Sequence, residues 1–184
     1  MDQRPKCIIV TGRPGSGKTT LAEVLAEHLW MPVISRDAIK EGYVNTYGVN
    51  HDQLPADTNQ VVSDLFFALV SQTLAGKVSV IIEAAFQHKL WASMIGSIQE
   101  LSNPFIIACT IDGAMAAKRH LERGLADPRR EFFHGDETIS IYRETGLLPP
   151  PSDYIHPNFD LPTINVSTVD EYVLTNMRRQ LKRL

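Results

Sequence analysis

Residues 12–19 concentrate the groups in this chain that are best suited to binding phosphate. The segment follows the apolar run 7–10, Thr20 continues it into a helix-patterned stretch, and it reads Gly12, Arg13, Pro14, Gly15, Ser16, Gly17, Lys18 and Thr19. Backbone N–H groups can approach a phosphate closely where glycine omits the Cβ atom, and a helix N-terminus adds its positive end. The spacing Gly-x-x-x-x-Gly-Lys-Thr between a strand and a helix therefore predicts a loop that binds a nucleoside triphosphate.

Two side chains of this loop have separate predicted tasks. Lys18 has the length to reach the β- and γ-phosphates, and the Thr19 hydroxyl can ligate Mg²⁺. The alternative is a glycine-rich turn that binds no ligand. The lysine, the threonine and the strand–loop–helix context together favour nucleotide binding by residues 12–20.

Asp37 directly follows the second predicted strand, residues 32–35. Open α/β sheets bind their ligands outside the carboxyl ends of the strands, so we expect Asp37 beside the phosphate loop. A carboxylate there can accept the proton of an attacking hydroxyl, or hold that hydroxyl in line with the γ-phosphate. It could equally cap a helix that starts at Ala38, and the two roles are compatible.

Glu83 ends the third predicted strand, residues 78–83. An apolar strand that ends in an acid is typical of the carboxylate on the Mg²⁺ side of phosphate-loop proteins, which acts through water. Thr19 and Glu83 are therefore the predicted metal-site residues, with Glu83 acting directly or through water. The alternative is a strand-end carboxylate exposed to solvent.

Arg119 and Arg123 lie four residues apart on a predicted helix, so their side chains share one face. Arg129 and Arg130 follow and complete a positive cluster. An arginine placed over the transferred phosphoryl group can contribute roughly 10³–10⁵ in rate. We predict Arg119 and Arg123 to act in catalysis, and Arg119 also in nucleotide binding. A solvated helix face neutralised by nearby glutamates is the alternative.

The elements that position these residues alternate between β-branched runs and helical patterns. Such alternation predicts an α/β domain with a parallel sheet covered on both faces. The expected strands are residues 7–11, 32–35, 78–83, 105–111 and 163–167, and the expected helices are 20–29, 57–75, 89–101, 113–123, 136–144 and 169–184. The helix 57–75 places in phase Val62, Leu65, Phe66, Leu69, Val70 and Leu74.

Length and composition limit the class of protein. The 184 residues suffice for a single domain, residues 1–184, with 43% apolar and 21% charged residues. The net charge of −3 and pI of 6.1 disfavour nucleic acid as the main partner. Cys7 and Cys109 are expected as buried thiols. No run is long enough to cross a membrane and no secretory signal fits, so a cytoplasmic location is expected.

Three segments between these elements are expected to be irregular or functional. Residues 124–135 form a polar, basic loop, and residues 146–160 are irregular because they contain three consecutive prolines. Residues 41–59 follow Asp37 and are expected to line the acceptor pocket, with Tyr43, Tyr47, His51 and Asp52 as candidates. His120 and His134 are expected at the surface of the basic loop rather than on a metal.

Residues 12–20, residues 34–40 and the pair Arg119-x-x-x-Arg123 resemble the motifs of the small phosphate-loop kinases. Among these kinases the chain is most similar to the group containing phage polynucleotide 5′-kinase, chloramphenicol phosphotransferase and zeta-toxin kinases. The resemblance extends over nearly the whole chain. The resemblance implies a P-loop NTPase fold with strand order 2-3-1-4-5 and ATP with Mg²⁺. It also implies Asp37 as the base, residues 124–135 as a mobile lid that carries arginines onto the phosphates, and residues 162–168 near the nucleotide base.

The sequence therefore predicts an ATP-dependent kinase whose acceptor is a hydroxyl group of a small molecule. The predicted catalytic residues are Lys18, Asp37, Arg119 and Arg123. One alternative is a polynucleotide or RNA 5′-hydroxyl kinase, although polynucleotide kinases carry an arginine where this chain has Lys40. The other is an ATPase or switch module that acts on a protein partner, in which Asp37 would be dispensable.

Overall fold

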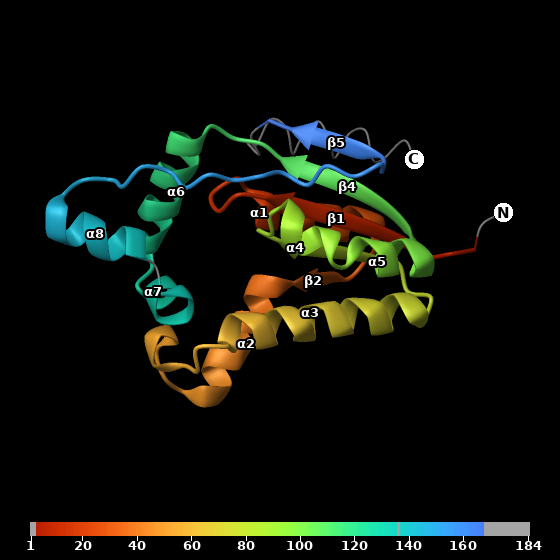
Figure 1. Ribbon diagram of the computed structural model, residues 1–184, viewed down its shortest axis with the longest axis horizontal. Coiled ribbons are helices and arrows are strands. Elements are labelled where there is room, and N and C mark those ends of the chain that lie inside the picture. Colours follow the sequence, from red (N-terminus) through yellow and green to blue (C-terminus); the bar gives the residue numbers. More distant parts are fainter. Residues whose placement is uncertain (1–2, 136, 168–184) are drawn as a thin grey trace.

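A five-stranded parallel sheet forms the centre of the molecule (Figure 1). The computed structural model describes residues 3–135 and 137–167. The strands are β1 (Lys6–Gly12), β2 (Val33–Ser35), β3 (Val80–Ala84), β4 (Asn103–Cys109) and β5 (Thr163–Val166), in the order β2-β3-β1-β4-β5. This confirms the predicted fold class, the strand order and all five strands, whose ends differ from prediction by at most two residues.

The helices follow the predicted order, with differences near Ala38, at residues 89–101 and at residues 124–135. They are α1 (Lys18–Leu29), α2 (Arg36–Tyr47), the 3₁₀ turn η1 (His51–Gln53), α3 (Thr58–Ala75), α4 (His88–Ala92), α5 (Ile95–Leu101), α6 (Gly113–Ala126), α7 (Arg129–His134) and α8 (Glu137–Thr145). The single helix expected at 89–101 is two short helices, and α2 begins before Ala38. The predicted helix 169–184 lies outside the described residues.

The expectation of a loop at residues 124–135 is wrong. The chain stays helical through Ala126, turns at Asp127 and Pro128, and then forms α7. Proline is tolerated at the start of a helix, where its missing N–H would have no intrahelical partner. The Asp-Pro pair therefore marks the boundary between two helices and not the middle of a loop.

The two faces of the sheet bury separate cores. Cys7 and Ile9 of β1 face the layer that contains α3, α4 and α5, whereas Val10 faces α1. This follows from the alternation of side chains along a strand. Burial raises the pKa of both thiols, Cys7 and Cys109, to about 12, and the two cysteines are free, as expected.

The amphipathic pattern of α3 is only partly as expected. Val62, Phe66, Val70 and Leu74 are fully buried, but Leu65 and Leu69 are 48% and 44% exposed. Phe67 takes a core position instead, where it contacts the rings of Phe86 and Trp91. The buried stripe of α3 is therefore narrower than the apolar pattern of its sequence.

The carboxyl ends of the parallel strands β1, β2 and β3 lie at the same end of the sheet, and the helices α2, α6 and α7 lie beyond that end (Figure 1). Residues 146–160 return from α8 toward β5 as an irregular segment, as expected, and we call this segment the strap. It is tied to the start of α4, since His88 N–H donates to the Ile155 carbonyl at 3.0 Å. None of the helices that the structure describes is long and apolar enough to span a membrane.

Candidate active site

The phosphate loop connects β1 to α1 and is shaped by glycines that no other residue could replace. Gly15 and Gly17 both have φ near +84°, in the left-handed region that favours glycine. A Cβ atom on Gly12 would lie 2.5 Å from the Cys109 carbonyl oxygen, and one on Gly15 would overlap the Ala116 carbonyl. The loop is therefore held tightly between β4 and α6.

Groups within this loop suit a phosphate ligand. The Ser16 hydroxyl is buried and has no hydrogen-bond partner in the described part of the chain. Such an orphan is unusual unless a ligand supplies the partner. Gly17 caps α1 without any side-chain hydrogen bond, so the N–H groups at the positive end of that helix stay available. These observations fit the binding of a nucleotide triphosphate group.

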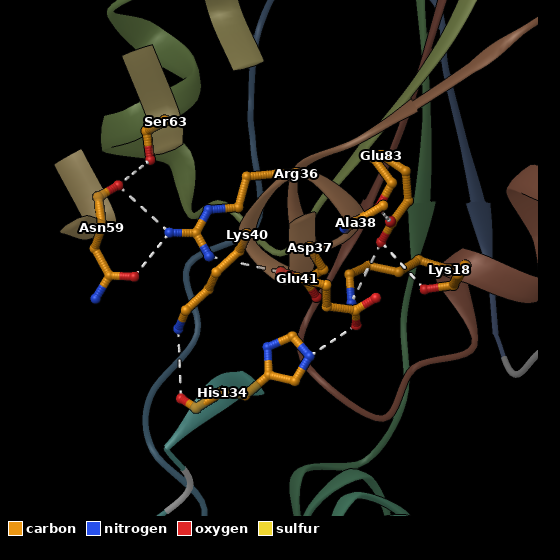
Figure 2. Close-up of polar contacts among 12 residues, drawn as sticks. Lys18, Arg36, Asp37, Ala38, Lys40, Glu41, Asn59, Ser63, Glu83 and His134 are labelled. Carbon is orange, nitrogen blue, oxygen red and sulfur yellow. Dashed lines mark hydrogen bonds and ion pairs between the residues drawn. The ribbon is translucent and has the colours of Figure 1, made fainter. Parts of the chain in front are cut away.

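Glu83 lies against the loop at the end of β3 and is 1% exposed (Figure 2). Its Oε1 lies 3.5 Å from Lys18 Nζ and accepts a hydrogen bond from the Thr19 hydroxyl at 3.4 Å. Its Oε2 accepts from the Ser35 hydroxyl at 2.7 Å. The alternative of a solvated strand-end carboxylate is therefore wrong.

The pair Thr19 and Glu83 fits a magnesium site. Mg²⁺ prefers hard oxygen ligands, keeps several waters, and usually takes only one or two groups from the protein beside the phosphates of its substrate. The described ranges contain no cluster of three or more histidine, cysteine or acidic residues that could enclose a metal. A hydroxyl and a carboxylate at the phosphate loop are consistent with that sparse ligand set.

Asp37 lies in the first turn of α2, and the structure excludes its role as the helix cap. The helix begins at Arg36, and Ser35 is the N-cap, since its hydroxyl accepts a hydrogen bond from Ala38 N–H at 3.4 Å. The carboxylate of Asp37 is left to interact with other groups. Arg36 Nη1 lies 3.6 Å from Asp37 Oδ1.

The cations around Asp37 set its charge. Burial raises the pKa of Asp37, but Lys18, His134, Arg36 and Lys40 together lower it more, so that the pKa lies below its ordinary value of 3.8. Asp37 is therefore ionised at neutral pH. An ionised carboxylate can accept the hydrogen bond of a substrate hydroxyl.

Arg36 is a site residue that the sequence analysis missed. Its Nη2 donates to Asn59 Oδ1 at 2.9 Å, which ties the guanidinium to α3, while Nη1 faces Asp37 (Figure 2). Burial lowers the pKa of Arg36. Its place beside the strand-end acid was visible in the sequence, but its tether to Asn59 was not.

His134 and Lys40 join α7 to α2. His134 Nε2 lies 3.0 Å from Glu41 Oε1, and Lys40 Nζ donates to the His134 carbonyl at 3.4 Å (Figure 2). Burial, reinforced by Arg36, lowers the pKa of Lys40 to about 8. The expectation of His134 as a surface residue is wrong, because its ring is largely buried against a glutamate 93 residues away.

A cavity of about 330 Å³, which we call the reaction cavity, lies between the phosphate loop and these helices. It brings together predicted site residues Lys18, Thr19, Asp37 and Arg123. Its other lining residues are Pro14, Arg36, Lys40, Ala85, His120, Arg130, His134 and Gly135. Asp37 is the one carboxylate among the described residues that line it, so the reaction cavity is strongly positive.

Arg119 lies in a different cavity from Asp37. It lines a cavity of about 360 Å³ with Gly15, Gly17 and Thr20, which we call the nucleotide-side cavity. Arg123 lines both cavities. The structure thus places Arg119 beside the phosphate loop, and Arg123 between the loop and Asp37.

The remaining basic and aromatic candidates lie apart. Arg129 is exposed and binds Asp127, with Nε 2.9 Å from Oδ1. The Tyr43 hydroxyl donates to that of Tyr47 at 3.2 Å on an exposed part of α2. The expectation that these tyrosines line the acceptor pocket is therefore not met in the reaction cavity.

His51 and Asp52 contact the end of α7. A Cβ atom on Gly135 would overlap the His51 ring and would lie 2.8 Å from Asp52 Oδ1. Residues 41–59 thus contribute to the site mainly by holding α7 and not by lining the reaction cavity with the side chains that the sequence suggested.

Known proteins are similar to this chain in sequence. Residues 7–139 match the profile of a protein family described as an AAA domain. Adenylate kinase 1 from Nostoc sp. (strain PCC 7120) is 29% identical over 190 residues, which cover 95% of this chain and 97% of that protein.

Solved structures share the fold. A candidate kinase from Chloroflexus aurantiacus has a TM-score of 0.75 at 24% identity, with 98% of each chain covered. The APS kinase CysC from Mycobacterium tuberculosis, solved with AMPPNP and APS, has a TM-score of 0.60 at 14% identity, covering 98% of this chain and 96% of that one. The likeness to phosphate-loop kinases that the motifs indicated thus extends to the fold.

Proposed function

The chain belongs to the AAA domain family, and from that premise we propose that it is an ATP-dependent kinase, which transfers the γ-phosphate to a hydroxyl group of a small molecule. The observation that carries the proposal is the ionised Asp37, which lines the same cavity as Lys18, Thr19 and Arg123. A carboxylate that faces the phosphate loop, and is not needed as a helix cap, is free to act on an acceptor. A cytoplasmic location belongs to the same proposal.

In this mechanism Asp37 orients the acceptor hydroxyl and takes its proton as the new bond to phosphorus forms. Its lowered pKa makes it a weak base. That suffices, because phosphoryl transfer has a loose transition state in which the nucleophile loses its proton late. Orientation by Asp37 also holds the hydroxyl in line with the leaving group.

The basic residues neutralise charge on the transferred group. Lys18 and Arg123 border the reaction cavity from the loop and from α6, so both can contact the oxygens of the γ-phosphate. Arg119 would contact the nucleotide from the other side of the loop. Thr19 and Glu83 would hold Mg²⁺, which supplies further charge neutralisation when bound.

Residues 124–135, now seen as the end of α6 and α7, would serve as the lid. His134 and Gly135 lie over the reaction cavity and contact α2 and η1. Exclusion of water by α7 would limit wasteful hydrolysis of ATP. We propose that Asp127 and Pro128 act as a hinge about which α7 moves. The far end of α7, with His134 and Gly135, would then open the reaction cavity for substrate entry.

The experiment that tests the proposal is single-turnover transfer from ATP to a panel of hydroxyl compounds by the wild-type protein and Asp37→Asn. Loss of the base should lower transfer by roughly 10²–10⁴. Because Ser35 and not Asp37 caps α2, the helix should stay intact. Loss of the carboxylate that faces Arg36 and Lys40 should lower the melting temperature by a few degrees, so circular dichroism is used to show that the variant is folded. Full transfer by a folded Asp37→Asn protein would overturn the assignment.

A second candidate follows from the Nostoc relative, whose name implies that it acts on adenylate. The positive residues Arg36, Lys40 and Arg130 in the reaction cavity would suit an acceptor phosphate. A phosphate acceptor carries no proton that must be removed at neutral pH, so Asp37→Asn would then keep most of its activity. The same measurement, with AMP included in the panel, distinguishes the two candidates.

A further inference from the structure

A third cavity, of about 300 Å³, lies between the tip of the phosphate loop, α6, α8 and the strap. We call it the strap cavity. It shares Pro14 and His120 with the reaction cavity, so the two are neighbours. Its residues on α6 include Gly113 and Ala117, whereas Arg119 and Glu122 of α6 line the nucleotide-side cavity. The strap cavity thus lies across α6 from the predicted nucleotide.

Arg13 supplies the main positive charge of the strap cavity. Although it belongs to the phosphate loop, its side chain points into this cavity, and its Cζ lies 5.8 Å from the centre of the Tyr154 ring. Its Nε is buried without a hydrogen-bond partner among residues 3–135 and 137–167. Glu137 is the one carboxylate of those residues that also lines the cavity, and no ion pair joins it to Arg13. Gly113 leaves the space that Nη1 of Arg13 fills. A guanidinium held in this way can pair with a carboxylate or a phosphate.

The rest of the cavity is lined mainly by apolar groups, which include Ala117, Ile141 and the consecutive strap prolines Pro149 to Pro151. Glu137, Thr138 and Ser152 add polar groups to this lining. Proline fixes the backbone angle φ, so the wall that the prolines form loses little freedom when a ligand binds. Tyr154 is fixed as well, since its hydroxyl donates to the Phe86 carbonyl at 2.8 Å. The volume is at the lower end for cavities that bind small organic molecules.

We propose that the strap cavity binds the body of the phosphoryl acceptor, and that the acceptor carries an oxyanion, a carboxylate or a phosphate, which pairs with Arg13. The apolar part of the acceptor lies against the prolines of the strap, and its hydroxyl reaches Asp37 past Pro14 and His120. This inference rests on the proposed kinase function, and it names the class of acceptor: an anionic alcohol with an apolar body.

The test compares acceptors in matched pairs. Hydroxy acids and their neutral hydroxy amides of equal size, together with phosphorylated alcohols and their dephosphorylated forms, are assayed for kcat/KM at saturating ATP. We expect a preference of roughly 10- to 100-fold for the anionic member, as for a charge-assisted pair. Arg13→Gln should bring that ratio close to one. A ratio is used because any change in ATP binding by this loop variant cancels from it.

A blocking variant tests the location independently. Ala117→Trp fills the strap cavity, and Ala114→Trp places the same side chain on the exposed side of α6. We expect Ala117→Trp to raise KM for the anionic acceptor at least tenfold, and Ala114→Trp to leave it near the wild-type value. Direct binding of each hydroxy acid without ATP, measured by saturation-transfer NMR, provides a readout that does not need catalysis.

The outcomes separate this inference from the function on which it rests. If transfer depends on Asp37 but neither Arg13→Gln nor Ala117→Trp changes the acceptor preference or the KM for the acceptor, the inference is wrong and the kinase assignment stands. Binding of hydroxy acids that depends on Arg13, with no transfer to any of them, would support the cavity and contradict the hydroxyl kinase. Preference for neutral acceptors, or neither binding nor transfer across the panel, would overturn the inference.

Discussion

The phosphate loop and the wall formed by α2 and α7 both border the reaction cavity, but they offer a ligand different groups. The loop acts mainly through backbone groups, and its glycines are fixed by contacts with Cys109 and Ala116. The wall acts through side chains, namely Arg36, Asp37 and Lys40 of α2 and His134 of α7. A side chain can be exchanged without moving the backbone, whereas the glycines cannot. We therefore expect the backbone of the loop to determine that a triphosphate binds, and the side chains around it, those of the wall and that of Arg13 in the strap cavity, to determine which acceptor reacts.

The largest effect should come from Lys18→Ala, which removes the lysine of the phosphate loop. Loss of the cation should lower phosphoryl transfer at least about 10³-fold, because the developing charge loses its main contact with the protein. The same change leaves Glu83 buried without its cation, which should lower the free energy of unfolding by about 3–5 kcal/mol. Urea denaturation measures the second effect separately from the first.

The control for Lys18→Ala is the double variant with Glu83→Gln. Removing the buried charge should restore part of the stability. Transfer should stay low, because Glu83 itself belongs to the proposed magnesium site. If the double variant were as unstable as Lys18→Ala, Lys18 would stabilise the loop through contacts other than that with Glu83.

The second largest effect should divide the two arginines of α6. Arg123 borders both cavities, so Arg123→Ala should lower kcat by about 10²–10³ with a smaller change in the KM for ATP. Arg119→Ala should mainly raise the KM for ATP, because Arg119 borders only the nucleotide-side cavity among the three cavities described above. Steady-state kinetics of both variants checks this, and identical profiles would show that the two cavities act as one.

The same contrast explains what the sequence could predict. Residues 12–19 are contiguous, and each residue type in them has a local reason, so the loop was predictable in full. The central strands β1, β3 and β4 were predictable because burial on both faces makes most of each strand apolar. The α2–α7 wall was not, because His134 meets Glu41 only when segments 93 residues apart are packed together.

Single residues show where local reasoning was too weak. Asp37 was assigned equally to base and helix cap. The position of Ser35 rules out the cap, whereas the role of base stays a prediction. Arg13 was predicted simply as part of the loop, since no sequence pattern indicates that its side chain turns toward Tyr154. The helix α7 was taken as a loop because polar, basic residues with a proline are common to both.

A smaller effect should appear in the contact between α7 and α2 when the pH is lowered. Burial lowers the pKa of His134 below 6.5, although Asp37 and Glu41 raise it in part. The folded state thus favours the neutral ring, so the stability from this group is complete above about pH 6.5 and is lost as pH falls through the lower, folded-state pKa. We expect amide exchange in residues 129–135, corrected for intrinsic rates, to rise by a factor of a few.

The comparison for this pH effect is His134→Gln, which cannot be protonated and should exchange with little dependence on pH. The amides of α1 provide an internal control, because they belong to the loop side of the cavity. Equal acid sensitivity in α1 and α7 would mean that the whole domain loosens and that the wall is no more adjustable than the loop.

The smallest effect should come from Tyr154→Phe, which removes one hydroxyl and keeps the ring beside Arg13. The Tyr154 hydroxyl donates to the Phe86 carbonyl at 2.8 Å and lies 3.4 Å from the Thr11 hydroxyl. It therefore ties the strap to β1 and to the segment that follows β3, next to the phosphate loop. Its removal should lower the free energy of unfolding by about 1 kcal/mol, the usual value of one hydrogen bond. Thr11 keeps its bond from the Trp91 indole N–H at 2.9 Å, so the loop should keep its shape and the affinity for ATP should not change.

The strap, which lines the strap cavity, loses one of its anchors, so the KM for an anionic acceptor should rise by a few-fold. Calorimetry of ATP binding beside acceptor kinetics separates the two. A fall in ATP affinity equal to the rise in acceptor KM would show that the strap supports the phosphate loop itself, and that the two sides of the site are not independent.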